Sequence, residues 1–529
     1  MTTTVVPTRP VLPDVSEARL DLYSSLMARL LTLWIVLIAV ATFVTVPWLS
    51  HVNNGDLTVA MTWFYHALML PSALLFLILC TRVFTTHPWV RYLLSHSAPV
   101  AILEGLGFLI LGYGTEHHMS SLVSFGYWII MPLTIELFAV TVLFVGDLAF
   151  AAFWPPSGER MAPQKAEIHW ALFFAGVSVL TWVVLGIAAA ASVVGVSWSF
   201  WAQAQHETTS TLMGNIITSH SHGMLPSFMA GIVFLAAEAF GYSQLSGLRK
   251  QVARGSVGIM LGGIALYSGV YLVSALGTFV IPAWFPYGPG GVNGLAMDDT
   301  FTGLVGLGAL ILALDMAPEV RGSFQRAAGA VRARFNPVRL GVYMTYVMAA
   351  AALFLYGYYI ENNENQFGAG ALPAARAVGD QVFTRTHLLL AFGSLPIIAV
   401  FLLAAELFGG TSGMRAALKQ WMSAIVLGGM IVSTAGMGIW AFATPSHATT
   451  WSLTSSGAIL YMAGQSLILL GAVVELFTMR TAQPVEAPAS GPPKEMPPAQ
   501  AVLTPEHGNG QEAGPAWQAE PARQGAAEQ

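Results

Sequence analysis

Hydrophobic runs recur along almost the whole chain and are separated by short polar stretches. Twelve of these runs come close to the ~20 residues that an α-helix needs to cross a bilayer. Because backbone polar groups must be paired within lipid, each run is predicted to be a helix. The expected spans are residues 26–49, 57–81, 94–114, 120–152, 168–196, 215–243, 255–283, 301–317, 340–359, 383–408, 421–444 and 455–478. The pattern therefore predicts an all-α, polytopic membrane protein with about twelve transmembrane helices.

The composition supports this prediction and divides the chain into three parts. Only 9% of the residues are charged, whereas soluble domains carry about 25%. We expect a cytoplasmic segment at residues 1–25 and a membrane domain at 26–480. The remaining residues, 481–529, are rich in Pro, Ala, Glu and Gln, which is typical of a disordered tail.

Basic residues gather in alternate loops, which predicts the orientation. They follow the even-numbered spans: Arg82, Arg91, Arg160, Lys165, Arg249, Lys250, Arg254, Arg321, Arg326, Arg332, Arg334, Arg339, Arg415, Lys419 and Arg480. Both termini are therefore predicted to face the cytoplasm.

Three of the predicted spans share a pattern and are separated by equal numbers of spans. They contain WFYHALMLPSALLFLIL, TSHSHGMLPSFMAGIVFLAAEAFG and TRTHLLLAFGSLPIIAVFLLAAELFG. Each begins near a histidine and continues as an apolar helix. We interpret the chain as three pseudo-symmetric four-helix units, and internal repeats of this kind are common in membrane proteins.

The single cysteine, Cys80, narrows the possible chemistry. It excludes an internal disulfide, a CxxCH haem attachment site, a dicopper centre built on two cysteines and a cysteine-ligated iron–sulfur cluster. A metal centre in this chain would therefore depend on other ligands.

The 13 histidines fall into two groups. Ordinary polar surface is the expectation for His51, His87, His96, His169, His206, His447 and His507, which lie in loops or at span ends. Ionisable residues inside spans are functional candidates by default, and six histidines are predicted there at one depth near the outer face: His66, His117, His118, His220, His222 and His387.

The spacing of these six predicts metal ligands. His220 and His222 project about 200° apart on a helix, so one helix would serve a group on each side. His117 and His118 are adjacent and would reach one metal together with His66. Neutral imidazole suits iron, copper and zinc. His387 would pair with whichever member of the HxH faces it, as a bis-imidazole haem requires.

These motifs resemble the catalytic subunit of the haem–copper oxidase superfamily, which includes the nitric oxide reductases. In that family an HxH helix binds two haems, and the resemblance implies a high-spin haem on His220 and a low-spin haem on His222 and His387. It implies a non-haem iron or copper on His66, His117 and His118. The stretch GTEHHMSSLVSFGYW is most similar to the nitric oxide reductase branch, where a Tyr–Trp follows the histidine pair.

The order of the motifs departs from the family, because the helix with the lone histidine comes last. The chain resembles a circular permutation by one four-helix unit. Leu70 stands where oxygen reductases carry a tyrosine, and Tyr113 is the alternative tyrosine near the metal. Glu104 and Glu136 are candidates for the carboxylates of nitric oxide reductases. Arg385 is placed to pair with haem propionates.

The resemblance implies an oxidoreductase that reduces nitric oxide to nitrous oxide in a bacterial or archaeal cytoplasmic membrane. Its partners would be lipid, a gaseous substrate and an electron donor, either a cytochrome or cupredoxin subunit or quinol, with no nucleic acid. Alternatives are an oxygen-reducing terminal oxidase, a non-enzymatic haem protein and a secondary transporter. Discontinuous helices at the two MLPS segments would favour the transporter.

Overall fold

The computed structural model describes residues 17–49, 54–154, 161–193, 196–204, 208–276, 301–316 and 413–442, with scattered positions at 399–407 and 460–473. The chain divides into two units, Met1–Pro484 and Val485–Gln529, and all the described residues belong to the first. The regular structure of the described part is helical, as the sequence predicts.

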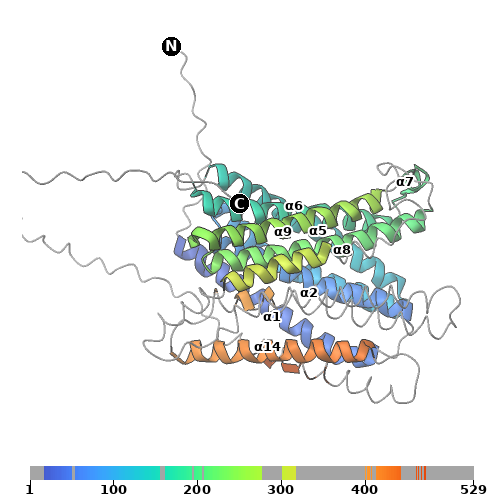
Figure 1. Cartoon of the computed structure of the whole chain (residues 1–529). Helices are drawn as coiled ribbons and strands as arrows, with labels where there is room; N and C mark the ends of the chain where they lie inside the picture. Colours follow the sequence, from blue (N-terminus) through green and yellow to red (C-terminus); the bar gives the residue numbers. More distant parts are fainter. Residues whose placement is uncertain are drawn as a thin grey trace, which may run out of the picture. The chain divides into compact units, whose positions relative to one another are not determined.

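Figure 1 shows the helices of the first unit, most of which are long. Their bounds are α1 (Glu17–Leu49), α2 (Asn54–Val83), α3 (Pro88–His96), α4 (Ala98–Glu116), α5 (Ser120–Phe153), α6 (Pro163–Val193), α7 (Ser199–Ala204), α8 (Thr209–Ala239), the 3₁₀ turn η1 (Tyr242–Gln244), α9 (Gly247–Leu276) and α14 (Gly413–Phe442). A further helix covers Phe301–Met316.

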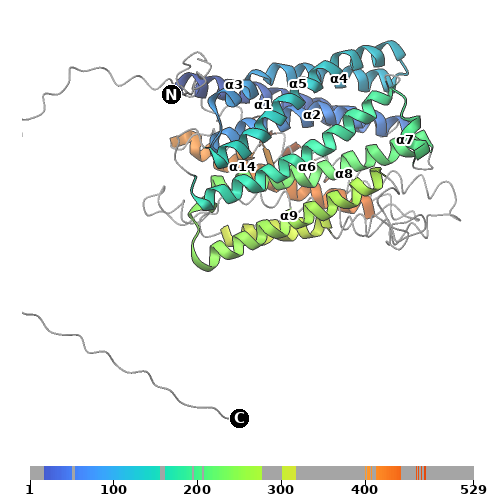
Figure 2. The ribbon, with the colours of Figure 1, turned by 90° about the horizontal axis from the view of Figure 1, so that it is seen from above.

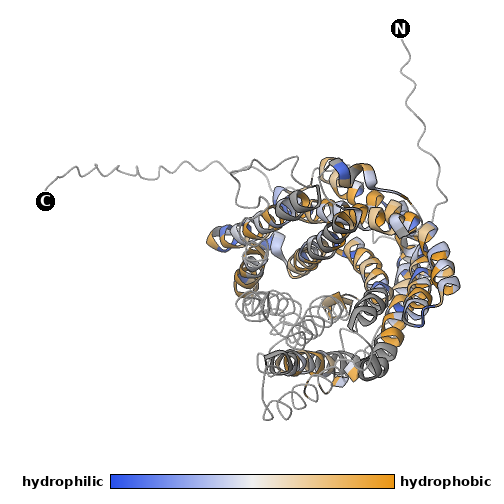
Figure 3. Cartoon of the chain, turned by 90° about the vertical axis from the view of Figure 1, so that its right-hand side faces the viewer, coloured by the Kyte–Doolittle hydropathy of each residue, from blue (hydrophilic) through white to orange (hydrophobic). Residues whose placement is uncertain are grey.

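Five described segments are long and apolar enough to cross a membrane. They are Arg19–Ile38, His66–Val83, Pro88–Thr115, Ser120–Phe153 and Pro163–Ser192. Large apolar side chains are exposed on their outer surfaces, among them Trp128 and Phe174, and Figure 3 shows apolar residues on the outside of the helices. Such a surface suits a lipid environment.

The predicted third span at 94–114 is wrong at its start. The apolar segment begins with α3 at Pro88, and Ser97 separates α3 from α4. Pro99 lies in the first turn of α4 and has no N–H to continue the hydrogen-bond ladder of α3. The predicted span at 340–359, and most of those at 383–408 and 455–478, lie outside the described residues.

Neighbouring helices pack in a continuous sequence. Contacts join α1 to α2, α2 to α4, α4 to α5, α5 to α6, α6 to α8 and α8 to α9, and α2 also contacts α8. Figure 2 shows α6, α8 and α9 side by side. Three serine hydroxyls, Ser178, Ser227 and Ser268, connect these three helices at 2.8 and 2.9 Å.

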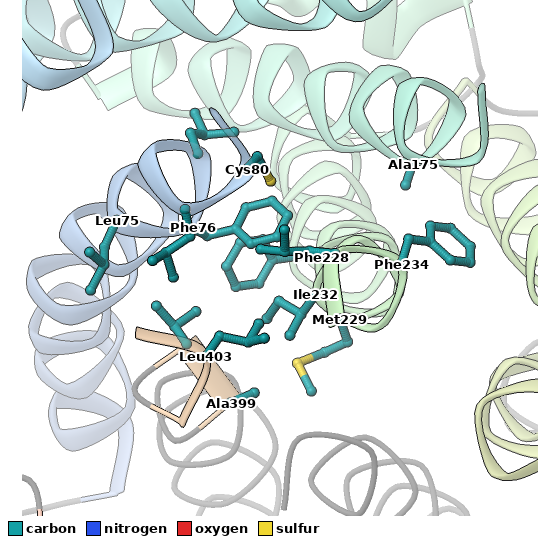
Figure 4. Close-up of a cluster of buried hydrophobic side chains, with 14 of the residues drawn as sticks. Leu75, Phe76, Cys80, Ala175, Phe228, Met229, Ile232, Phe234, Ala399 and Leu403 are labelled. Carbon is teal, nitrogen blue, oxygen red and sulfur yellow. The ribbon is translucent and has the colours of Figure 1, made fainter. Parts of the chain in front are cut away.

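The core between α2 and α8 is apolar. Phe76 and Phe228 meet edge to face with ring centroids 5.2 Å apart, and Figure 4 shows them beside Leu403 from a distant part of the chain. Cys80 is buried as a free thiol in the same cluster. This packing fixes α2 against α8 and so positions the histidines on both helices.

The two MLPS segments form the same local structure. Pro71 and Pro226 lie inside α2 and α8, where each removes one backbone hydrogen bond. In each helix the serine that follows donates to the carbonyl four residues earlier: Ser72 to Leu68 at 2.7 Å and Ser227 to Gly223 at 3.0 Å. This similarity agrees with the repeat expected from the sequence.

Candidate functional site

His220 on α8 is held in a fixed orientation by the neighbouring helix α6. Its Nδ1–H donates to the carbonyl oxygen of Trp182 at 2.7 Å. Since a carbonyl only accepts, this bond assigns the proton to Nδ1 and leaves the lone pair on Nε2. A histidine that binds a metal characteristically donates its other ring N–H in this way.

Two glycines allow α6 and α8 to approach at this point. A Cβ at Gly186 would lie 2.5 Å from the His220 ring, and a Cβ at Gly223 would overlap the Trp182 indole. Trp182 is fully buried. Its indole Nε1–H is also buried and has no hydrogen-bond acceptor among the described residues. The segment around His220 is therefore tightly packed and still holds an unused donor.

His66 on α2 lies next to His220. The two imidazole rings are nearly parallel, at 10°, with centroids 6.3 Å apart. Phe108 of α4 stacks on His66 with a centroid distance of 4.9 Å. Two histidines that are distant in sequence thus meet between α2 and α8, as expected if both serve one centre.

Glu104 lies on α4, one turn from Phe108, and is fully buried. One carboxyl oxygen accepts a hydrogen bond from the Thr134 hydroxyl of α5. The other, Oε2, is buried with no partner among the described residues. A buried polar atom without a partner is costly and marks a candidate functional position.

His117 and His118 lie away from this pair. His117 follows the last residue of α4, and both histidines are exposed in the turn before α5. The turn requires the left-handed region at His118, where φ is 54°. Phe108, which stacks on His66, lies about 13 Å below His117 along α4 at 1.5 Å per residue. The expectation that all six histidines share one layer therefore fails for this pair.

The described residues contain no group of three His, Cys, Asp or Glu side chains that could hold a metal ion. The predicted ligand set of His66, His117 and His118 is thus not assembled, and its metal stays a prediction. Tyr113 is exposed and packs its ring 4.2 Å from that of His117. The side chain of His222, like His387 and Arg385, lies outside the described residues.

Glu136 differs from Glu104 although both are acids inside apolar helices. Glu136 lies on α5 with its side chain exposed, while Glu104 is buried between helices. Of the two predicted carboxylates, Glu104 is the one that shares the interior with Phe108 and His66.

His169 was expected at the surface, and this expectation is wrong. The side chain is fully buried on α6. Its Nδ1–H donates to the Lys165 carbonyl at 3.1 Å, and its Nε2 accepts the Thr85 N–H at 3.1 Å. Both nitrogens are used, so His169 has a structural role and ties the α2–α3 connection to α6.

His87 was also expected to be ordinary surface, but it forms part of the same connection. Its Nδ1 lies 2.5 Å from the Asp147 carboxylate of α5, and its backbone N–H donates to the other carboxylate oxygen at 2.9 Å. Asp147 is nearly fully buried. The α2–α3 connection is therefore held from α5 as well as from α6.

A third polar group joins α6 to η1 and α9. Glu167 accepts hydrogen bonds from the Tyr242 hydroxyl at 2.7 Å and from Arg254 through two nitrogens at 3.0 Å. The Lys250 ammonium lies 3.5 Å from the Tyr242 ring centroid. Burial, and then Glu167, raise the pKa of Tyr242, whereas burial lowers the pKa of Lys250.

Sequence reasoning missed several residues around His220. Trp182 and Thr134 lie in apolar runs where aromatic and hydroxyl residues are common packing residues, and Gly186 and Gly223 carry no signal without their neighbours. The one available hint was Gly223, which directly follows the HxH.

No protein-family model matches this chain, and no curated protein matches it.

Proposed function

We propose that this chain is a membrane oxidoreductase that holds haem iron through His220 and reduces nitric oxide to nitrous oxide. The observation that supports it most is the pairing of His220 with His66 from a second helix, with His220 oriented by the Trp182 carbonyl. Imidazole with an available Nε2 is the common protein ligand of haem iron.

The donor set of His220 fits a haem ligand. Nδ1 is occupied by a carbonyl, and the glycines at 186 and 223 keep α6 close enough for that bond. Bound haem would supply the capacity to accept and donate one electron at a time. Glu104 has one carboxyl oxygen without a partner among the described residues, and it is suited to hold or release a proton nearby.

The three-histidine metal site does not fit the described arrangement, so no step is assigned to it. The proposal also includes the finer architecture: twelve spans in three four-helix units, with both termini in the cytoplasm.

Net reduction of two nitric oxide molecules consumes two electrons and two protons and yields one nitrous oxide and one water. A cytochrome or cupredoxin subunit, or quinol, would donate the electrons.

The experiment is a reduced-minus-oxidised visible spectrum of detergent-purified protein from haem-replete cells, with haem and metal content per chain. We expect haem bands in the wild type and their loss or shift in His220→Ala. His96→Ala is the matched control, because His96 is exposed and bonds only Tyr23 among the described side chains. A colourless wild-type protein would overturn the proposal and favour a transporter.

Substrate is then tested with electrodes for nitric oxide and oxygen, using a chemical reductant as the electron source. Consumption of nitric oxide with formation of nitrous oxide supports the proposal. Oxygen consumption alone would identify the chain as a terminal oxidase. Haem without turnover of either gas would indicate a non-enzymatic haem protein.

A further inference from the structure

The outward face of α5 is unusual among the described membrane helices. Within the 18-residue apolar stretch of Ser120–Phe153, only 22% of the residues are buried. Its exposed side chains include Phe125, Trp128, Pro132, Ile135, Glu136, Ala139, Val142, Leu143, Gly146 and Phe150. Most are apolar and suit lipid, but one is an acid.

Glu136 stands at the midpoint of α5, where a bilayer offers no water. The other acids in the candidate spans all have partners: Asp21 pairs with Arg82, Glu104 accepts from Thr134, Asp147 pairs with His87, and Glu167 pairs with Arg254. A carboxyl group that faces hydrocarbon has a free-energy cost of several kcal/mol. The exposed position of Glu136 therefore indicates that another protein surface covers it.

Helix α6 provides the contrast. Its 18-residue apolar stretch is also largely unburied, with 28% of the residues buried. Its exposed residues beyond the first turns are nevertheless Phe174, Val177, Thr181 and Val184. The Thr181 hydroxyl donates to the carbonyl of Val177 at 3.0 Å, so this face leaves no polar group exposed to lipid. Low burial alone thus does not require a partner, and the difference on α5 is Glu136.

We propose that a second copy of this chain packs its α5 against this face, with the two Glu136 side chains meeting across a twofold axis. A protonated carboxyl both donates and accepts a hydrogen bond, so glutamate is its own complement. A second copy also presents this group at the same membrane depth, which a partner of different sequence must match separately.

The shape of the face suits helix pairing. Pro132, Ala139 and Gly146 are all exposed at intervals of seven residues, and no atom lies within 4 Å of a Cβ built on Gly146. At 100° per residue, Glu136 and these three residues fall within an arc of about 80°. Small residues at heptad spacing allow two α-helices to approach closely in a left-handed supercoil. Polar side chains stabilise such pairs.

The test is disulfide cross-linking in native membranes. The single native cysteine is buried, so Cys80→Ser gives a cysteine-free background. Ala139→Cys is then compared with Val177→Cys on the exposed face of α6. We expect oxidation to shift the Ala139→Cys chain to twice its 56.4 kDa mass and to leave the Val177→Cys chain monomeric. Formation of the disulfide requires Cα atoms within about 7 Å.

Glu136 is tested in the Ala139→Cys background. Glu136→Leu is expected to lower the cross-linking yield about tenfold, whereas Glu136→Gln keeps a self-complementary amide and most of the yield. Equal yields at positions 139 and 177, no dimer at 139, or an unchanged yield in Glu136→Leu would each overturn the proposal. Cross-linking of position 139 to a different protein would also overturn it. The comparison of 139 with 177 uses intact Glu136, so it stands even if Glu136→Leu fails to fold.

Discussion

Two sets of polar residues in this protein differ in whether their side-chain atoms have hydrogen-bond partners. Around the α2–α3 connection and η1, both side-chain hydrogen-bonding atoms have partners in His169, Asp147 and Glu167. Around His66 and His220, buried polar atoms lack partners among the described residues: Trp182 Nε1 and Glu104 Oε2.

Whether a buried side chain has all its hydrogen-bond partners distinguishes structural from candidate functional residues better than its position in the sequence does. His169 and His220 lie in similar apolar helices, yet His169 uses both ring nitrogens and His220 only Nδ1 in the described structure. A fully bonded imidazole has no lone pair left for a metal, whereas His220 keeps one. The predictions below test this contrast.

The largest expected effect separates the two histidines by haem content. His220→Ala should remove the haem that His220 holds and so lower the haem content per chain, whereas His169→Ala should keep the wild-type haem content in the folded fraction. His169→Ala should instead lose about 3 kcal/mol of stability, because it leaves the Thr85 N–H without the His169 acceptor and creates a cavity. Haem assay and thermal unfolding in detergent measure both. Equal loss of haem in the two variants would contradict the assignment of His220 as a haem ligand and of His169 as a structural residue.

Buried Glu104 and half-buried Glu167 should differ in how much each contributes to the stability of the fold. Glu167→Leu is expected to cost about 2–3 kcal/mol, since it removes the partner of Tyr242 and of the cationic Arg254 and Lys250. Glu104→Leu should change stability by less than about 1 kcal/mol. It removes one hydrogen bond from the Thr134 hydroxyl, but it also replaces Oε2, which has no partner among the described residues, by apolar volume. The same variant should slow nitric oxide reduction. A larger stability loss in Glu104→Leu than in Glu167→Leu would contradict the assignment.

Overpacking the contact between α6 and α8 should displace His220, because the Trp182 carbonyl accepts its hydrogen bond. Gly223→Ala places a methyl group against the indole and should cost about 2 kcal/mol. It should also shift the haem absorption bands, a change that general destabilisation would not cause. Gly262→Ala on α9 is the matched control, because its Cβ meets no atom within 4 Å and the substitution favours helix by about 1 kcal/mol.

The smallest effect concerns alkaline pH. The pKa of Tyr242 is raised in the folded protein from its ordinary value of 10.0, so the unfolded chain loses this proton first as pH rises. The contribution of Tyr242 is therefore complete below pH 10.0 and declines above it. Tyr242→Phe should lower stability at neutral pH by about 1 kcal/mol and flatten the decline above pH 10. Thermal unfolding from pH 8 to 11 measures both slopes, and parallel slopes would contradict the prediction.

The helices were largely predictable because a bilayer imposes a length and an apolar composition on each. The expected span at 120–152 corresponds to α5 at Ser120–Phe153. The resemblance implied that His66 and His220 lie at one centre, and the two rings do lie side by side; the metals of that centre stay a prediction. The α3–α4 break was missed because Ser97 and Pro99 stand in an otherwise continuous apolar run.

The remainder of the site depends on three-dimensional contacts that a pattern does not encode. The Trp182 carbonyl is a backbone atom, and every residue has one, so no residue type marks it. The burial of His169 depends on the α2–α3 connection folding back so that the Thr85 N–H reaches α6. The separation of His117 and His118 from His66 follows from where α4 ends.

The prolines of the two MLPS segments have a mechanical consequence. Pro71 leaves the Ala67 carbonyl without its helical donor, and the Trp34 indole of α1 donates to it at 3.3 Å. A helix is most compliant where its ladder is interrupted, and in α2 and α8 this occurs within two turns of His66 and His220. Both histidines therefore lie close to a deformable turn of their helix. Bending at Pro71 and Pro226 would change the distance between the His66 and His220 rings.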